Sequence, residues 1–384
     1  MVVSSVTRRN PPMSDSLLRI MQDDPEAGTS CARPPKGLSP DDLRRIYRNM
    51  VMIRAFDERQ RNLQRSGRIG FCVSATGEEA VSAGVCAALE DDDWIFPYYR
   101  QHGMLLCRNV PLERMMAHLF GNEQDLAKGR QMPAHFTDRS ARFVSASSVI
   151  GTQLIHAVGA AMAAKYKKDP VAVAAFIGDG GTSSSDFHSA LTFAGVYKAP
   201  VVVFIVNNQY AISLPVSKQC AAETLHLKAQ GYGLPALRVD GNDAVAVALA
   251  SREALGRARS GEGPTLIELV TYRLGPHSSS DDPSRYRDEC ETAEWAAKDP
   301  IGRMRRYLEH LALWDADAET EVWEQARTAV NAASATAEKV SEPGWATMFD
   351  DVYAELPPAL ALQRDEFLAR ESGLNRASEG EFPL

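Results

Sequence analysis

Residues 171–181 read VAVAAFIGDGG and residues 200–210 read PVVVFIVNNQY, and these two stretches decide the predicted fold. Each begins with an apolar run typical of a buried parallel strand. A glycine-rich turn follows the first run, and we expect a helix from about Asp186 to Tyr197. The result is a strand–helix–strand unit with Asp179 beyond its first strand and two asparagines, ending in Asn208, beyond its second. In an open parallel sheet both positions lie at the carboxyl ends of strands, where ligands bind.

These strand ends offer the hard oxygen ligands that Mg²⁺ accepts while phosphate oxygens and water complete its octahedron. Asp179 supplies a carboxylate, Asn208 an amide oxygen, and the backbone carbonyl of Tyr210 a third ligand. The glycines of the turn, which permit close backbone approach to an anion at a helix N-terminus, are Gly178, Gly180 and Gly181. The alternative is an ordinary strand-to-helix turn followed by asparagines that cap a strand.

Length and composition narrow the function classes. The 384 residues can bury a large core, as one large α/β domain or two smaller ones. A net charge of −8 argues against nucleic acid or an anionic membrane as the main partner. No apolar run approaches the length of about 18 residues that a membrane span needs. The six cysteines are scattered without a C-x-x-C pair, which favours a reducing compartment over a disulfide framework or a zinc site.

The order of the expected elements predicts one doubly wound α/β domain with a parallel sheet. We divide the chain into a largely irregular N-terminal arm (1–38), the α/β domain (39–300) and a helical C-terminal extension and tail (301–384). The first residues faintly resemble a transit peptide but lack an amphipathic pattern. We interpret them as the leader of a cytoplasmic protein of bacterial type, with the mitochondrial matrix as the alternative location.

Among the helices expected outside the central unit, three bear on the argument. Ser39 as N-cap, followed by proline and two acids, predicts a helix to about Ser66. Residues 103–120 have a helical pattern. A helix at 152–165 is rich in alanine and glycine, which permits close helix packing and indicates a tight interface, such as one between subunits. The helix propensity of alanine is the alternative explanation for part of the run.

Two further stretches carry polar groups of interest. Arg100, after a short strand, is the first cation that we expect to grip a phosphate, since a guanidinium binds two oxygens at once; the alternative is a surface arginine. Residues 144–153 read VSASSVIGTQ, and their hydroxyls and carbonyls either cap the following helix or ligate a monovalent cation. Capping is the default expectation.

Several motifs together resemble one family, the α subunits of the thiamine-diphosphate-dependent 2-oxo acid dehydrogenases, and most closely the branched-chain type. The resemblance runs from about Leu43 to Tyr353 and returns in the last four residues, EFPL. The motifs that carry it are the GDG and NN pair, KGRQMPAHF (128–136), SSVIGTQ (147–153), NNQYAIS (207–213) and YRLGPHSSSDDPSRYR (272–287). Pyruvate and acetoin enzymes, the alternative, tend to show GGSMH in place of the first motif and a shorter histidine loop.

The resemblance implies a role for each matching residue. Asp179, Asn208 and the Tyr210 carbonyl match magnesium ligands, and Tyr99 and Arg100 match diphosphate contacts. His277 matches an active-site histidine that steadies the diphosphate and handles a proton during acyl transfer. The residues matching positions beneath the cofactor ring are Ser148 and Ile150, and those matching a potassium site are Ser147, Val149 (by its carbonyl), Thr152 and Gln153. We expect Phe71 and Tyr98 to line the substrate pocket.

Three positions depart from the family pattern or extend it. Ser184 stands where the family usually has glutamate, and Val206 stands where some members have arginine, so one contact to the cofactor and one to phosphate are in doubt. Ser278 matches the serine that is phosphorylated in mitochondrial relatives. A phosphate there would repel the diphosphate beside His277. We do not expect such regulation here.

The resemblance implies oxidative decarboxylation of branched-chain 2-oxo acids, with acyl transfer to a lipoyl group on an acyltransferase. It also implies a β subunit that completes the active site, in a heterotetramer of two α and two β chains. A rival interpretation from another class is a non-catalytic, phosphate-binding structural subunit. The combination of Arg100, the GDG and NN pair and the His277 loop weighs against it.

Overall fold

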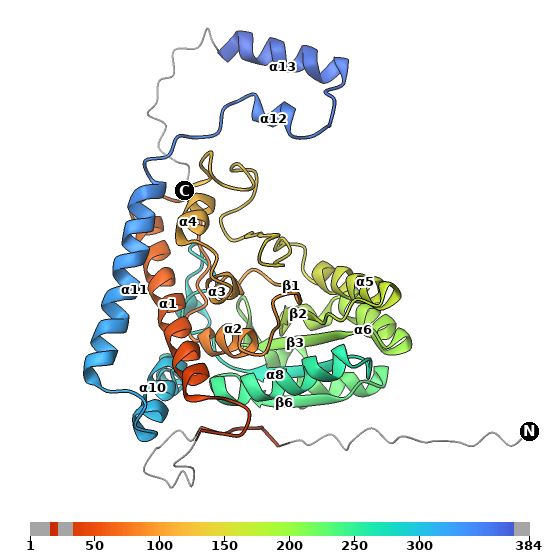
Figure 1. Ribbon diagram of the computed structural model, residues 1–384, viewed down its shortest axis with the longest axis vertical. Helices are drawn as coiled ribbons and strands as arrows, with labels where there is room; N and C mark the ends of the chain where they lie inside the picture. Colours follow the sequence, from red (N-terminus) through yellow and green to blue (C-terminus); the bar gives the residue numbers. More distant parts are fainter. Residues whose placement is uncertain (1–15, 22–33, 372–384) are drawn as a thin grey trace, which may run out of the picture.

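The computed structural model describes residues 16–21 and 34–371, and its centre is a five-stranded parallel sheet (Figure 1). The strands are β1 (Trp94–Phe96), β2 (Val173–Gly178), β3 (Val201–Asn207), β6 (Ala236–Asp240) and β7 (Thr265–Val270). They lie in the order β1-β2-β3-β7-β6. The register sets Gly178 beside Val206 and Asn207 beside Val270, so that the carboxyl ends of the three central strands meet at one edge.

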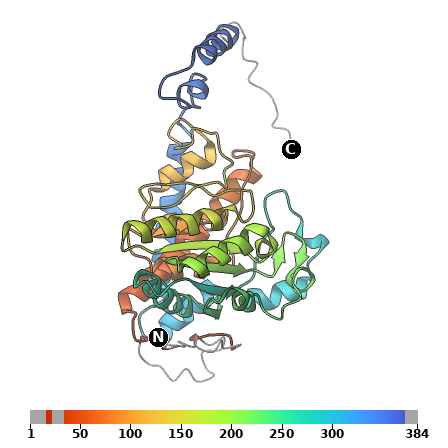
Figure 2. The same cartoon turned by 90° about the vertical axis from the view of Figure 1, so that its right-hand side faces the viewer.

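Helices cover both faces of the sheet, as Figures 1 and 2 show. One face packs against α1 (Pro40–Arg65), α2 (Glu79–Cys86) and α8 (Ala244–Arg259), and the other against α5 (Thr152–Lys167) and α6 (Ser185–Tyr197). Alternate strand residues enter the two layers. Phe176 and Phe204 stack at 4.9 Å on the first face, while the neighbouring isoleucines point to the second. The predicted doubly wound α/β fold is therefore confirmed.

Helix boundaries follow local capping chemistry. Ser39 caps α1 as expected: its hydroxyl accepts from the Asp42 N–H (3.1 Å) while the Asp42 carboxylate accepts from the Ser39 N–H (3.0 Å). The prediction of one helix at 103–120 was wrong. The structure has α3 (Gly103–Cys107) and α4 (Leu112–Phe120), separated where Asn109 adopts a left-handed conformation (φ +58°) and Pro111 follows.

The remaining elements frame the site and extend the molecule. They are η1 (Gly180–Ser183), β4 (Tyr210–Ala211), β5 (Leu214–Pro215), α7 (Val216–Gln219), η2 (Leu225–Tyr232), η3 (Pro283–Arg285), α9 (Glu289–Ala296), α10 (Pro300–His310), α11 (Ala316–Ala337), α12 (Thr347–Asp350) and α13 (Pro358–Glu371). Helix α11 packs along α1 and α4, while α12 and α13 project away from the body (Figure 2). None of the helices in the described ranges is long and apolar enough to cross a membrane.

The described part of the N-terminal arm contacts the edge of the sheet. Leu18 pairs with β6 in parallel. The Leu18 N–H donates to the Arg238 carbonyl (2.9 Å), and the Leu18 carbonyl accepts from the Asp240 N–H (3.0 Å). This pairing covers an edge strand. The expected leader, Cys31 and the EFPL tail lie outside the described residues, and the three-part division of the chain stays a prediction.

Candidate functional site

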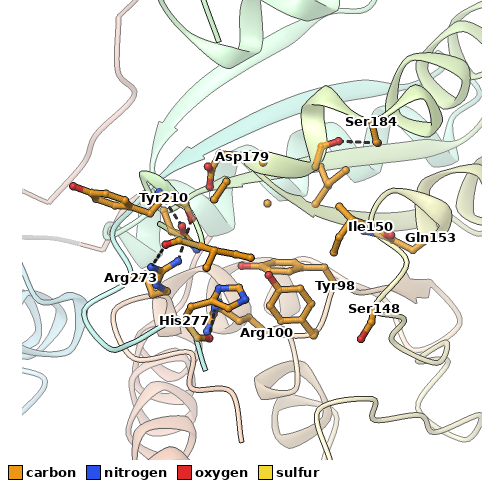
Figure 3. Close-up of a pocket in the computed structure, with 18 residues that line it drawn as sticks. Tyr98, Arg100, Ser148, Ile150, Gln153, Asp179, Ser184, Tyr210, Arg273 and His277 are labelled. Atoms are coloured by element: carbon orange, nitrogen blue, oxygen red, sulfur yellow. Dashed lines mark hydrogen bonds between the residues drawn. The ribbon is translucent and has the colours of Figure 1, made fainter. Parts of the chain in front are cut away.

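A cavity of about 580 Å³ opens at the carboxyl ends of β2 and β3 (Figure 3). It brings together, from segments far apart in the sequence, every residue that we predicted to bind cofactor: Tyr99, Arg100, Ser148, Ile150, Gly178, Asp179, Gly180, Gly181, Asn208, Tyr210 and His277. Tyr98 also lines it, whereas Phe71 does not. Parallel strands explain the convergence, because their ends share one edge of the sheet.

Asp179 has the least satisfied carboxylate of this cavity. The residue is 1% exposed, and its Oδ2 atom has no hydrogen-bond partner within the described structure. Burial, with the nearby Glu78 carboxylate as a further cause, raises the pKa of Asp179 to about 7. A buried carboxylate without a partner is costly unless a cation neutralises it. The arrangement therefore fits a metal ligand.

The Asn208 side chain is oriented for the same purpose. Its amide nitrogen donates to the Glu78 carboxylate (2.7 Å), which leaves the amide oxygen with one long contact, from the Tyr210 N–H (3.4 Å). The Tyr210 carbonyl accepts one bond from Arg273 (3.1 Å) and keeps its second lone pair. The preceding Asn207 does something else: its side chain donates to the buried Glu268 (2.8 Å) and fixes the strand end.

Glu78 is a functional residue that our sequence reasoning missed. It is 1% exposed and accepts from both the Tyr98 hydroxyl (2.7 Å) and the Asn208 amide (2.7 Å), while Arg100 Nε lies 3.7 Å away. The Glu78 carboxylate thus orients the predicted metal ligand Asn208 and the cavity residue Tyr98, and it lies close to the Arg100 guanidinium. The available signal was two consecutive acids at 78 and 79, to which we assigned no role in the site.

Two buried guanidinium groups make the cavity attractive to anions. Arg100 and Arg273 are each 1% exposed, and the Nε atom of each has no hydrogen-bond partner in the described residues. Arg273 was not predicted as a site residue. Burial and the neighbouring Arg100 both lower its pKa from the ordinary value, although the group stays a cation at neutral pH. Phosphate oxygens are suitable partners for this pair.

His277 is held as a neutral hydrogen-bond donor. Arg100 donates to its Nδ1 (3.1 Å) and to its backbone carbonyl (2.8 Å), and since arginine only donates, the ring proton sits on Nε2. Burial, then Arg100 and Arg273, lower the pKa of His277 to about 4. The His277 N–H in turn donates to Asp281 (2.7 Å), which fixes the loop. Ser278 beside it is half-buried.

The glycines of the turn have a steric reason. A Cβ atom added to Gly181 would lie 2.4 Å from the Ile177 side chain, and one added to Gly180 would lie 2.6 Å from the Cβ of Ala211. Both distances are too short for atoms that are not bonded. The backbone at this turn therefore passes close to its protein neighbours, and the predicted close approach to an anion stays a prediction.

The loop before α5 contradicts one expectation. We expected its hydroxyls to cap the helix by default, but the N-cap is Gly151 (φ +100°) and no side chain bonds to the first turn. Instead Ser147 Oγ accepts from the Val149 N–H (3.1 Å), and Gln153 donates to the Phe176 carbonyl (2.8 Å). Gln153 lines the cavity, whereas Ser147, Val149 and Thr152 do not. The predicted potassium site at these residues stays a prediction.

The two departures from the family pattern have clear structural places. Ser184 lines the cavity, but its hydroxyl is used at the N-terminus of α6: it donates to the Gly181 carbonyl (2.8 Å) and accepts from the Phe187 N–H (3.3 Å). Val206 is fully buried in the core and does not line the cavity. Some family members have an arginine at the position of Val206. In this chain the cavity has its second guanidinium from Arg273 instead.

An apolar groove of about 310 Å³ lies between α5 and α6. Its walls include Gly159 from the small-residue helix, with Ile155 (42% exposed) and Phe193 (51% exposed) at its surface. Val149, in the loop before α5, is 66% exposed. Exposed apolar side chains around a groove are typical of surfaces that bind a partner or a ligand.

Comparisons with known proteins agree on one family. A model of the family described as dehydrogenase E1 component matches residues 47–345. The chain is 43% identical to 2-oxoisovalerate dehydrogenase subunit alpha of Pseudomonas aeruginosa, over 91% of this chain and 87% of that protein. It is 42% identical to 3-methyl-2-oxobutanoate dehydrogenase subunit alpha of Mycobacterium tuberculosis (89% and 90%) and 41% identical to the mitochondrial 2-oxoisovalerate dehydrogenase subunit alpha of Homo sapiens (87% and 75%).

Proposed function

The chain belongs to the dehydrogenase E1 component family, and we propose that it is the α subunit of a branched-chain 2-oxo acid dehydrogenase. The family is thiamine-diphosphate dependent. The activity is the oxidative decarboxylation of branched-chain 2-oxo acids such as 3-methyl-2-oxobutanoate, with transfer of the acyl group to a lipoyl group of an acyltransferase. The relatives at 41–43% identity, which carry the branched-chain name, support this substrate class over pyruvate or acetoin.

One observation carries the cofactor assignment: the buried Asp179 carboxylate, whose Oδ2 atom has no hydrogen-bond partner among the described residues, shares a cavity with two buried guanidiniums. A diphosphate and a divalent cation satisfy both halves of this charge pattern. Asp179, Asn208 and the Tyr210 carbonyl would hold Mg²⁺, while Arg100, with Tyr99 beside it, would contact the diphosphate. When bound, thiamine diphosphate supplies the carbanion that attacks the 2-oxo carbon and the ring that takes up the electrons left by departing carbon dioxide.

The chain's own residues orient this assembly. Glu78 fixes the Asn208 amide and compensates Arg100, and the glycine turn admits the phosphates close to the backbone. His277 donates from Nε2 toward the cavity, which steadies a phosphate oxygen. A bound diphosphate raises the pKa of this histidine from its low value, because an anion favours the imidazolium form. His277 then becomes able to exchange a proton during acyl transfer.

The same observations weigh against a non-catalytic, phosphate-binding subunit. A phosphate site alone needs the guanidiniums and a helix N-terminus, and it has no use for a buried carboxylate that costs free energy. His277, which lines the cavity as a neutral ring with its proton on Nε2, is likewise superfluous in a structural phosphate site. Metal-assisted diphosphate binding next to a histidine explains all of these groups.

A β subunit completes the proposed enzyme. Val149 is exposed in the loop whose residues Ser148 and Ile150 line the cavity, and the α5–α6 groove is apolar; we assign both to contact with that partner. The assembly includes two α and two β chains and serves a lipoyl-bearing acyltransferase. Potassium, held by Ser147, Val149, Thr152 and Gln153, belongs to the same proposal. The proposed setting is the cytoplasm of a bacterial-type cell.

The test is turnover by the chain co-expressed with its β partner, supplied with thiamine diphosphate, Mg²⁺ and an artificial electron acceptor. We expect 3-methyl-2-oxobutanoate to be decarboxylated with a higher kcat/KM than pyruvate. A preference for pyruvate would keep the cofactor site and move the enzyme to the alternative substrate class. Binding of thiamine diphosphate without turnover of any 2-oxo acid would support the structural-subunit interpretation instead.

A further inference from the structure

A second histidine, His135, bonds to a residue that lines the same cavity. It lies in the long connection between α4 and α5, which also carries Ser148, and we did not predict His135 itself as a site residue. Its Nε2 atom is 2.5 Å from Ser148 Oγ, and its Nδ1 atom is 3.1 Å from the Gln131 side-chain oxygen. The diphosphate is proposed to bind at the side of the cavity that holds Asp179 and Arg273. Figure 3 shows Ser148 on the other side.

The connection is folded in a way that fixes this pair. Asp138 and Phe143 bond to each other through both N–H groups (3.0 and 2.9 Å), and the Ala146 N–H donates to the Phe136 carbonyl (3.1 Å). These bonds close a hairpin whose two ends carry His135 and Ser148. The Phe136 ring packs against His118 at 4.7 Å, which anchors the hairpin to α4. The backbone bonds of the hairpin therefore place His135 and Ser148 next to each other.

The partners determine where the protons lie. The Gln131 side-chain oxygen only accepts, so His135 carries its proton on Nδ1. Partial burial, and then the nearby His118, lower the pKa of His135 from its ordinary value, which keeps the ring neutral. Its Nε2 atom is then an acceptor, and the Ser148 hydroxyl must donate to it. Because Ser148 lines the cavity, its oxygen can still accept a hydrogen bond from a molecule bound there.

We propose that Gln131 and His135 are positioning residues that hold Ser148 as a hydrogen-bond acceptor for the reacting oxygen of the 2-oxo acid. The proposal rests on the proposed function. The keto oxygen of the substrate only accepts hydrogen bonds. Attack on its carbon turns it into an alkoxide, which takes up a proton from water to become a hydroxyl, and a hydroxyl donates. An acceptor at Ser148 bonds to the reacting oxygen only as the reaction proceeds. Such an interaction raises kcat without tightening substrate binding.

The experiment compares four variants of the α chain in the co-expressed complex. Ser148→Ala removes the acceptor, and His135→Phe keeps the ring but removes the atom that orients it. His135→Gln places an amide oxygen near the Nε2 position, so it conserves an acceptor for the Ser148 proton. His310→Phe, at the end of α10, is the matched control for loss of an imidazole elsewhere in the chain.

We expect Ser148→Ala and His135→Phe each to lower kcat about tenfold with KM nearly unchanged, the size of one lost hydrogen bond. His135→Gln should retain most of the kcat, and Ser148→Ala combined with His135→Phe should be no slower than Ser148→Ala alone. A wild-type kcat in His135→Phe, or equal losses in the Phe and Gln variants, would overturn the proposal.

A second measurement decides the matter without turnover. In the ¹⁵N-histidine-labelled complex, we expect the His135 signals of a neutral ring protonated at Nδ1, assigned by their disappearance in His135→Gln. A ring protonated at Nε2 would overturn the proposal even in an inactive complex. A wild-type complex that shows the expected ring but turns over no 2-oxo acid would instead count against the proposed function.

Discussion

Replacing Asp179 by asparagine should make the cofactor-free protein more stable than the wild type. With cofactor and metal bound, the variant should be less stable than the wild type. The carboxylate is buried, its Oδ2 atom has no hydrogen-bond partner among the described residues, and burial raises its pKa from 3.8 to about 7. A raised pKa means that folding opposes ionisation of this acid. The folded state therefore loses stability as the pH rises from about 4 to about 7, and the loss is constant above that range.

The size of the effect follows from the shift in the pKa. Each pKa unit corresponds to about 1.4 kcal/mol, so ionised Asp179 lowers the free energy of unfolding by on the order of 4 kcal/mol at pH 8. Asparagine has nearly the same shape and no charge to bury. Asp179→Asn should recover most of that free energy at pH 8 and almost none at pH 4, where the wild-type acid is already protonated.

Thermal unfolding of the co-expressed α/β complex measures both halves of this prediction. Without metal and cofactor, the variant should have a Tm several degrees above that of the wild type at pH 8. With Mg²⁺ and thiamine diphosphate, the wild-type Tm should rise by ligand linkage while the variant gains little. The order of the two proteins is thus expected to invert. The reasoning would be refuted if the variant without metal and cofactor had a Tm no higher than that of the wild type. It would also be refuted if metal and cofactor raised the Tm of both proteins equally.

Further predictions concern the groups around this carboxylate. Glu78→Ala leaves buried donors without their acceptor, so we expect a loss of about 3 kcal/mol in denaturant unfolding and weaker cofactor binding through a misoriented Asn208; unchanged cofactor affinity would contradict this. Gly181→Ala places a Cβ atom 2.4 Å from an isoleucine and should cost about 1–3 kcal/mol, whereas the control Gly256→Ala, with nothing within 4 Å and inside α8, should stabilise by up to about 1 kcal/mol. Thiamine diphosphate with Mg²⁺ should raise the pKa of His277 from about 4 by NMR titration, and a pKa that stays there would separate this ring from the diphosphate.

The fold was predictable because its signal is local. The apolar runs that became β2 and β3 are too short and too rich in β-branched residues for helices, and Asp179 and Asn208 follow directly after them. Once both runs are parallel strands of one sheet, topology alone brings their ends together. Ser39 likewise sets the start of α1 through bonds within four residues of sequence.

The parts that sequence reasoning missed depend on tertiary contacts. Glu78 and a surface glutamate look the same in a sequence, and only the packing of Tyr98 and Asn208 around it gives it a role. Arg273 enters the cavity because the end of β7 lies beside the end of β3. We missed the split between α3 and α4 because the apolar pattern continues through the single left-handed residue that separates them, Asn109.

The central claim is that Asp179, Asn208 and the Tyr210 carbonyl hold one divalent metal on a diphosphate. The most direct measurement is anomalous diffraction from crystals of the α/β complex grown with thiamine diphosphate and Mn²⁺ in place of Mg²⁺. We predict one strong peak per α chain, at coordination distance of about 2.2 Å from all three oxygens and touching the diphosphate. A peak at another position, or a bound cofactor with no metal against Asp179, would contradict the account.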